Sequence, residues 1–161
     1  MFKEGQNYNV TNNGLIATKI SENKWDCVVF GDKEIPKNRI SKWKIKINKN
    51  KTNKTNIDIA IGISPISFKG DKYNEYWSII SVAEKTLLYI KDKSQNYNNY
   101  KGTMKEGDIY KVIVDRKLGN LSFSINNINY GIACSEIPKD DILFPTVVLF
   151  ERRIEVELLF T

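Results

Sequence analysis

Few residues in this chain could carry catalytic or metal chemistry. The sequence has 161 residues, no histidine and two cysteines, Cys27 and Cys134. Without an imidazole, the chain can form neither a Ser/His or Cys/His catalytic arrangement nor a histidine-containing metal site. The two cysteines lie far apart in apolar segments, where we expect reduced, buried thiols rather than a disulfide. We therefore expect neither a metal nor a cofactor.

The acidic residues do not suggest an enzyme either. Hydrolysis by paired carboxyl groups requires two of them to face each other across a substrate. Asp26, Asp115, Glu155 and Glu157 are the candidates, but no spacing among them forces a pair together. Glu155 and Glu157 share one strand face, as solvated residues at a sheet edge do. The sequence favours a binding protein over an enzyme.

Lysine supplies most of the net charge of +6. Lys42, Lys44 and Lys46 alternate along one predicted strand face, and further lysines follow up to Lys54. Such a stripe could bind polyanions weakly and in a salt-dependent manner. Trp43 points to the opposite face, and no aromatic residues alternate with the loop lysines as stacking platforms for bases. We therefore do not expect specific nucleic-acid binding, and weak polyanion binding stays an alternative.

Short β-strands must position these side chains, because apolar and polar residues alternate along most of the chain. In the clearest case, Trp43, Ile45 and Ile47 share one face. The predicted strands are 15–18, 25–30, 43–47, 57–63, 77–82, 86–90, 109–115, 121–125, 129–133, 144–150 and 154–160. We expect 43–47 and 57–63 to form a hairpin, and one helical turn near 135–141.

No window shows the 3.6-residue periodicity of an amphipathic helix, and turn residues recur at short intervals. The pattern predicts an all-β protein, a two-sheet antiparallel β-sandwich. We expect one domain over 1–161, with its core at about 12–158. No apolar run is long enough to span a membrane, and the first residues do not resemble a signal peptide. We therefore expect a soluble, cytoplasmic monomer that does not bind membranes.

The most informative motifs lie in the segment 106–133. They read GDIYKVIVD (107–115), GNLSFSINN (119–127) and YGIA (130–133). These residues predict three adjacent antiparallel strands, because Asn126 and Asn127 tolerate the left-handed conformation of a tight hairpin turn. Val112 and Val114 would then face the core.

The order and spacing of these motifs resemble those of the SPRY domain family. Further matches are Trp43, IGIS (61–64), Trp77, Leu88-Tyr89 and FPTVV (144–148), so the resemblance covers nearly the whole chain. Asn127 stands where the family usually has glycine, and Ile79 replaces the second residue of an aromatic pair near Trp77. The resemblance implies a concanavalin-like jelly roll without catalytic activity. It also implies a protein or a short peptide as the partner, as in an adaptor or scaffold subunit of a ubiquitin-ligase-type complex.

In this family, loops at one end of the sandwich contact the partner. The corresponding loops here are 31–39, 64–76 and 150–153, and Phe150 stands where peptide-binding relatives often carry tryptophan. The expected partner-binding residues are Lys33, Glu34, Ile35, Pro36, Arg39, Phe68, Tyr73, Tyr76, Phe150 and Arg152.

Several of these residues also have a purely structural interpretation. Phe68 and Tyr73 could cover the end of a sheet, because loops commonly pack their own aromatic residues. Phe150 continues the alternation of the preceding strand and could belong to the core. Arg152 could be a solvated charge beside Glu151 or Glu155. We expect Trp25, Trp43 and Trp77 to serve in packing.

A carbohydrate is the second alternative ligand, since SPRY sandwiches are similar to legume lectins. The segment 96–100 contains Tyr97, Asn98, Asn99 and Tyr100, and sugar sites use aromatic platforms together with amide groups. The same composition is typical of a solvated loop.

Overall fold

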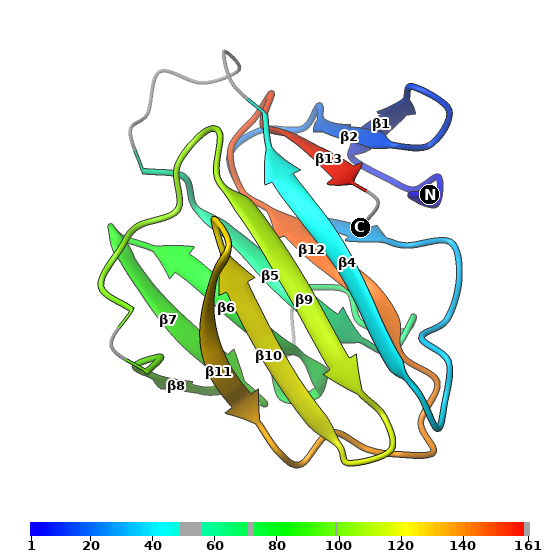
Figure 1. Cartoon of the computed structure of the whole chain (residues 1–161). Coiled ribbons are helices and arrows are strands. Elements are labelled where there is room, and N and C mark those ends of the chain that lie inside the picture. Colours follow the sequence, from blue (N-terminus) through cyan, green and yellow to red (C-terminus); the bar gives the residue numbers. More distant parts are fainter. Residues whose placement is uncertain (49–55, 71–72, 99, 160–161) are drawn as a thin grey trace.

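Two antiparallel β-sheets face each other in the computed structural model, which describes residues 1–48, 56–70, 73–98 and 100–159 (Figure 1). The seven-stranded sheet contains, in spatial order, β1 (Tyr8–Thr11), β2 (Ile16–Lys19), β13 (Glu155–Leu159), β4 (Ile40–Ile47), β9 (Ile109–Asp115), β10 (Asn120–Ile125) and β11 (Ile128–Cys134). The six-stranded sheet contains β3 (Cys27–Phe30), β12 (Phe144–Leu149), β5 (Ile59–Ser64), β6 (Trp77–Val82), β7 (Lys85–Ile90) and β8 (Lys93–Gln95). The predicted antiparallel β-sandwich is confirmed.

The main core lies between the two sheets. In β4, Trp43, Ile45 and Ile47 are buried, whereas Lys42 is exposed and Lys44 and Lys46 are half-buried, as the alternation predicted. The inner face of the opposite sheet contributes apolar residues at every second position of β3, β5 and β12. Burying both inner faces in this way provides the main stabilisation of the sandwich.

The segment β9–β10–β11 forms the predicted antiparallel meander. Val112 and Val114 are buried, and β10 places Phe123 on the same inner face. Asn126 and Asn127 form the β10–β11 turn with φ angles of 50° and 69°. Asparagine replaces glycine at this turn because its side chain tolerates the left-handed region.

A second apolar cluster covers the outer face of the six-stranded sheet. Here Ala60, Ile80 and Val148 point away from the main core and pack under residues of the segment 65–76. As a result, all six residues of β5 are buried. At Gly62, a Cβ atom would lie 1.9 Å from the main-chain oxygen of Trp77, so only glycine fits between these strands.

The predicted hairpin of 43–47 with 57–63 is wrong. Strand β4 pairs with β13 and β9, whereas β5 pairs with β12 and β6 in the other sheet. The alternation of apolar and polar residues indicates that one face of a strand is buried, but it does not identify the neighbouring strand.

The helical turn expected near 135–141 is also wrong. No helix forms there; Ile137 instead donates a main-chain hydrogen bond to the Gly119 oxygen, at 3.0 Å. The short 3₁₀ turn in the described residues is η1 (Tyr73–Glu75). Strands β1 and β8 were not predicted. Among the described residues, none of the helices reaches the length and apolar character that crossing a membrane would require.

Candidate partner-binding surface

The aromatic rings of Trp25 and Phe150 contact each other at one end of the six-stranded sheet. Their ring centroids lie 5.2 Å apart, and both residues are half-buried. The contact follows from strand register: Cys27 of β3 is opposite Leu149 of β12, so the residues before β3 and after β12 meet. We call this contact and its surroundings the Trp25–Phe150 surface.

Residues 20–26, here called the Lys19 loop, form one side of this surface and are held by a buried lysine. The ammonium group of Lys19 donates to the hydroxyl of Ser21 at 2.7 Å and to the main-chain oxygens of Ser21 and Glu22. It also forms an ion pair with Asp26 at 3.2 Å. These oxygens offset the cost of burying the charge.

A hydrogen bond connects the Lys19 loop to the β12–β13 junction. The main-chain N–H of Arg152 donates to the Asn23 side-chain oxygen at 2.7 Å, and the Arg152 side chain is exposed. The junction itself is fixed by Glu151, which is buried and accepts the Asp58 N–H at 3.1 Å. The main chain on both sides of Phe150 is therefore held in place before any partner binds.

The segment 65–76 reaches the same surface from the other side. Gly70, with φ of +81°, lies so close to the neighbouring main chain that a Cβ atom there would be 3.1 Å from the Trp25 oxygen. Phe68 and Tyr76 stack at 4.7 Å, and the Tyr76 hydroxyl donates to the Thr146 oxygen at 3.1 Å.

The contact role expected for Phe68 and Tyr76 needs correction, because both residues are buried. They cover the outward-facing residues of β5, β6 and β12 and have no surface to offer a partner. The main chain of Tyr73 belongs to η1, and the side chain of Tyr73 lies outside the described part of the structure, so its contact role stays a prediction.

The loop 31–39 lies at the opposite end of β12. Gly31 N–H donates to the Pro145 oxygen at 2.9 Å, and Ile35 N–H donates to the Leu143 oxygen at 2.7 Å. Phe150 follows the other end of that six-residue strand, so the distance between them is about 20 Å at 3.3 Å per residue.

Both ends of the segment 65–76 lie at the same end as 31–39, because Ser64 of β5 is opposite Phe144 and Trp77 of β6 is opposite Ile63. The expectation that all three loops form one rim is therefore wrong for 150–153, which only the part of 65–76 around Gly70 approaches.

Within the loop 31–39, Lys33, Glu34, Pro36 and Arg39 are exposed, as a contact role requires. Ile35 is buried, with 3% of its surface accessible, so its expected contact role is wrong too. Its side chain anchors the loop to the main core instead.

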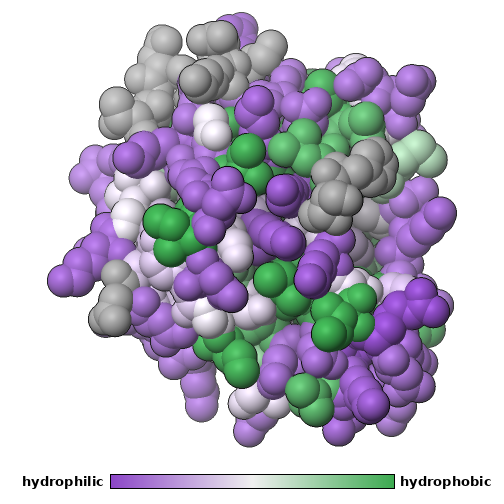
Figure 2. Space-filling view, in the orientation of Figure 1, coloured by the Kyte–Doolittle hydropathy of each residue, from purple (hydrophilic) through white to green (hydrophobic). Residues whose placement is uncertain are grey.

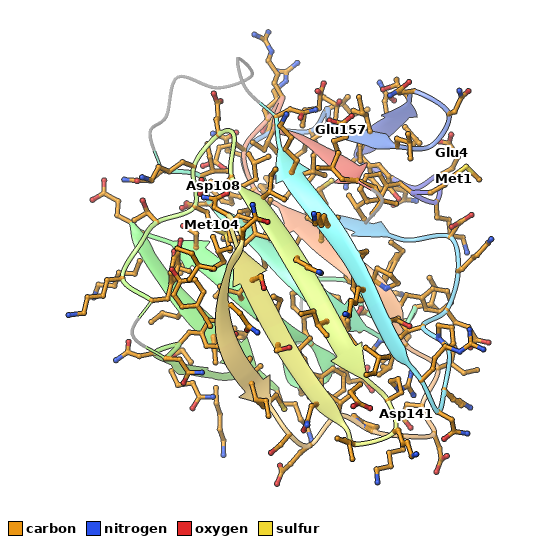
Figure 3. The ribbon with its side chains drawn as sticks, in the orientation of Figure 1. Met1, Glu4, Met104, Asp108, Asp141 and Glu157 are labelled. Atoms are coloured by element: carbon orange, nitrogen blue, oxygen red, sulfur yellow. The ribbon has the colours of Figure 1, made fainter. Side chains whose placement is uncertain are left out.

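Arg116, which sequence reasoning missed, fixes this end of the sandwich. Its guanidinium is buried and donates to the Ile35 oxygen at 3.2 Å, the Lys139 oxygen at 3.1 Å and the Asp141 oxygen at 2.5 Å. Burial lowers the pKa of the guanidinium, and nearby Asp141 opposes that shift. Figure 3 places Asp141 at the end of the sandwich opposite Asp108 and Glu157.

The loop proposed for sugar binding packs against β11. Tyr97 is buried; its hydroxyl donates to the Gly131 oxygen at 2.5 Å and accepts the Phe123 N–H at 3.0 Å. Tyr100 packs edge-on against Tyr130 at 4.9 Å. Tyr97 thus cannot serve as the exposed platform that a sugar site needs, and Asn99 lies outside the described residues.

The lysine stripe lies on the outer face of the seven-stranded sheet, which is largely hydrophilic (Figure 2). Lys44 pairs in register with Lys111, and Lys46 pairs with Glu157 of β13. Strand β13 is an interior strand, so the edge position expected for Glu155 and Glu157 is wrong. Lys49, Lys51 and Lys54 lie outside the described residues.

Both cysteines are free thiols, Cys27 buried and Cys134 half-buried. Burial raises the pKa of Cys27 to about 12. Within the described residues, no group of three or more Cys, Asp or Glu side chains is placed to hold a metal ion.

The SPRY domain of human HERC1 superimposes with a TM-score of 0.72 at 21% identity, covering 95% of this chain and 92% of that domain. The TRIM65 PSpry domain gives 0.70 at 9% identity, with 97% and 87% covered. The NHR domain of Neuralized from Drosophila melanogaster gives 0.63 at 16% identity, with 96% and 86% covered.

At these low sequence identities, the three structural similarities establish the fold of this chain and nothing further. A comparison with curated protein sequences finds no match. The sequence profile of the SPRY domain, in contrast, matches residues 40–160, about three quarters of the chain and the part that contains both the meander and Phe150. The chain therefore belongs to the SPRY domain family.

Proposed function

We propose that this chain binds a short segment of a partner protein at the Trp25–Phe150 surface. SPRY domains are generally non-catalytic interaction modules that bind proteins or peptides. The observation that carries the proposal is the contact between two half-buried aromatic rings, 5.2 Å apart, on main chain that is fixed from both sides. Aromatic residues in such positions are the usual anchors of protein interfaces.

Rigidity supports the proposal. The Lys19 loop is held by a buried ammonium group, and the β12–β13 junction is held by Glu151 and Asn23. A surface with fixed main chain loses little conformational entropy when a partner docks, so more of the contact energy appears as affinity.

Arg152 is exposed and follows Phe150 by two residues, so its guanidinium supplies a charged donor close in sequence to the aromatic pair. Arginine binds carboxylates through two parallel hydrogen bonds, and the chain has a net charge of +6. We therefore expect the bound segment to combine an apolar residue, which contacts Trp25 and Phe150, with an acidic residue near Arg152.

Lys33, Glu34, Pro36 and Arg39 form a separate exposed surface at the opposite end of β12. In this proposal they do not contact the residues bound at Phe150, because they lie about 20 Å away at the other end of β12. A role in partner binding for these four residues requires a partner that extends along the flank of the sandwich.

We further propose that the chain is the recruiting part of a cytoplasmic adaptor or scaffold, such as a ubiquitin-ligase complex, and that it is a monomer. The support is the SPRY fold itself, since such domains generally act as interaction modules.

A peptide array at physiological salt tests the proposal, with Phe150→Ala and Phe144→Ala as matched variants. Phe144 is the half-buried aromatic residue at the other end of β12, where it packs edge-on against Phe30 at 6.4 Å. Truncating an interface anchor costs about 2 kcal/mol or more, so Phe150→Ala should weaken binding at least about thirtyfold. Phe144→Ala should leave binding of the selected peptide unchanged.

Three outcomes would contradict the proposal. Equal effects of the two variants would mean that the Trp25–Phe150 surface is not the site. Capture of anions that depends on Lys42, Lys44 and Lys46 and is lost in salt would favour the polyanion alternative. Glycan capture that is lost on changing Tyr100 would favour the lectin alternative.

A further inference from the structure

The turn between β1 and β2 contains the one Asn-Gly pair of the sequence, Asn13-Gly14. The hairpin lies beside the N-terminus (Figure 1). Asn13 has a φ angle of 56° and Gly14 one of 86°, and the Leu15 N–H closes the turn by donating to the Asn12 oxygen at 3.2 Å. Asn-Gly suits this turn because both residues tolerate positive φ. It is also the pair in which an asparagine amide is lost most readily, because glycine has no side chain to obstruct its own nitrogen.

The two groups that would react are not held by other contacts. Asn13 is exposed, and within the described residues no hydrogen bond engages its side-chain amide. The Gly14 N–H donates to no group in the described part of the chain either, so its proton can exchange with solvent. In the β10–β11 turn, by contrast, the amide of Asn126 donates to Asp108 Oδ1 at 3.0 Å and accepts the Ile109 N–H at 2.9 Å.

The position of the turn allows it to rearrange. Strand β1 has four residues and lies at the edge of the seven-stranded sheet, next to β2. Short elements at an edge open locally at a small fraction of the free energy of global unfolding. Asn13 can therefore leave the left-handed conformation and approach the Gly14 nitrogen while the core stays folded.

We propose that Asn13 is a site of spontaneous deamidation in the folded chain, and that its isoaspartate product releases the segment 1–3 from the turn. The deprotonated Gly14 nitrogen attacks the side-chain carbonyl carbon of Asn13 and forms a C–N bond. The side-chain amide leaves as ammonia, which takes up the proton that the Gly14 nitrogen lost. A succinimide ring remains.

Water then opens the ring, and it is the one co-reactant that the sequence of steps consumes. Breaking the ring bond between the nitrogen and the side-chain carbonyl gives aspartate on an unchanged main chain. Breaking the bond between the nitrogen and the main-chain carbonyl gives isoaspartate, whose main chain runs through the Cβ and Cγ atoms of residue 13. No electrons are transferred in either step.

The isoaspartate product should detach the N-terminal segment, because the added methylene displaces Gly14. The Gly14 oxygen accepts the N–H of buried Phe2 at 2.6 Å. Gly14 also lies so close to Met1 that a Cβ atom on the glycine would be 2.8 Å from the Met1 Cβ atom. A shift of the turn therefore separates the Phe2 N–H from its acceptor. The aspartate product leaves this bond in place.

The proposal is independent of peptide binding. Thr11 pairs with Ile16 next to the turn, whereas Tyr8 pairs with Lys19 at the other end of the hairpin. The turn and the Lys19 loop thus lie at opposite ends of β1 and β2. Binding of a peptide at Phe150 should survive deamidation.

Peptide mapping by mass spectrometry tests the proposal, with the folded full chain incubated in mildly alkaline buffer made with heavy-oxygen water. The peptide that contains Asn13 should lose ammonia, gain one heavy oxygen atom and separate into an aspartate and an isoaspartate form. Asn127 is the internal control, because it is exposed and has a φ of 69° but precedes Ile128. The β-branched side chain obstructs attack, so deamidation should be at least about tenfold faster at Asn13 than at Asn127.

Variants separate the chemistry from its consequence. Asn13→Gln should remove the site, and Ile128→Gly should create a second one at Asn127. Freshly prepared Asn13→Asp carries the new charge on an unaltered main chain. Amide hydrogen exchange at Phe2 should be faster in the purified isoaspartate form than in the parent chain, and unchanged in Asn13→Asp.

Three results would overturn the proposal. Deamidation of Asn13 only in urea would show that the fold protects the turn. Equal rates at Asn13 and Asn127 would show that Gly14 does not direct the reaction. Unchanged exchange at Phe2 in the isoaspartate form would contradict the release of the segment 1–3.

Discussion

Lys19 and Asp26 form an ion pair in which only the acid reaches solvent. The Lys19 Nζ atom lies 3.2 Å from the Asp26 Oδ1 atom; the lysine side chain has 0% and the aspartate side chain 36% of its surface accessible. Because the ammonium also binds the oxygens of Ser21 and Glu22, it fixes the loop that carries Trp25.

Replacing this lysine should therefore loosen the Trp25–Phe150 surface. In Lys19→Met, the loop oxygens lose their donor, which should lower the free energy of unfolding by about 2 kcal/mol in urea. Asp26→Asn should cost less than about 1 kcal/mol, because Asp26 is partly exposed. Limited trypsin digestion should cleave Lys19→Met after Lys24 faster than the parent chain. Unchanged cleavage would show that the loop is held by other contacts.

Arg116→Lys should destabilise the opposite end of the sandwich. The guanidinium reaches three main-chain oxygens from two loops, and the single ammonium of lysine does not reproduce this fork. We expect a loss of about 2 to 3 kcal/mol and faster amide hydrogen exchange in 33–39 and 139–142. Peptide binding at Phe150 should persist in the variant that remains folded. Slow exchange in both loops would contradict the assigned role of Arg116.

Stability should fall in alkaline solution. Burial raises the pKa of Tyr8 and Tyr97 from 10.0 to about 12, and that of Cys27 from 9.0 to about 12. Above pH 9 the unfolded chain loses protons that the native chain keeps, so the stabilisation is complete below pH 9 and is lost as the pH rises towards 12. Each group contributes a slope of about 1.4 kcal/mol per pH unit within its window.

The variant Tyr97→Phe checks this assignment. It removes one titrating hydroxyl, so its free energy of unfolding should decline less steeply above pH 10, even though the lost hydrogen bonds lower its stability at neutral pH. Urea titrations at several pH values measure both quantities. An identical slope in the two chains would rule out Tyr97 as a contributor.

Local pattern accounts for what could be predicted from the sequence. The predicted first and last residues of β6 and β9 agree with the structure, because alternation and flanking turns are local features of the sequence. Pairing between distant strands has no such signal, which is why β4 and β5 were joined incorrectly.

The burial of Phe68 and Tyr76 did have a signal in the sequence. Strand β5 is apolar or small at Ala60 and Gly62 as well as at its isoleucines, a pattern typical of strands covered on both faces. The roles of Lys19 and Arg116 had none, because the oxygens that they bind belong to main chain whose path only the fold determines. For the same reason the Lys19 loop was missed, and 31–39 and 150–153 were assigned to one end of the sandwich although they lie at opposite ends of β12.

Mapping of amide chemical shifts during titration with a peptide selected on the array is the most direct measurement of the central claim. The account predicts that the shifted amides cluster in 20–26 and 150–153, and that Phe150→Ala abolishes the shifts. Shifts confined to 31–39, to the lysines of β4 or to 96–102 would place the partner elsewhere and contradict it.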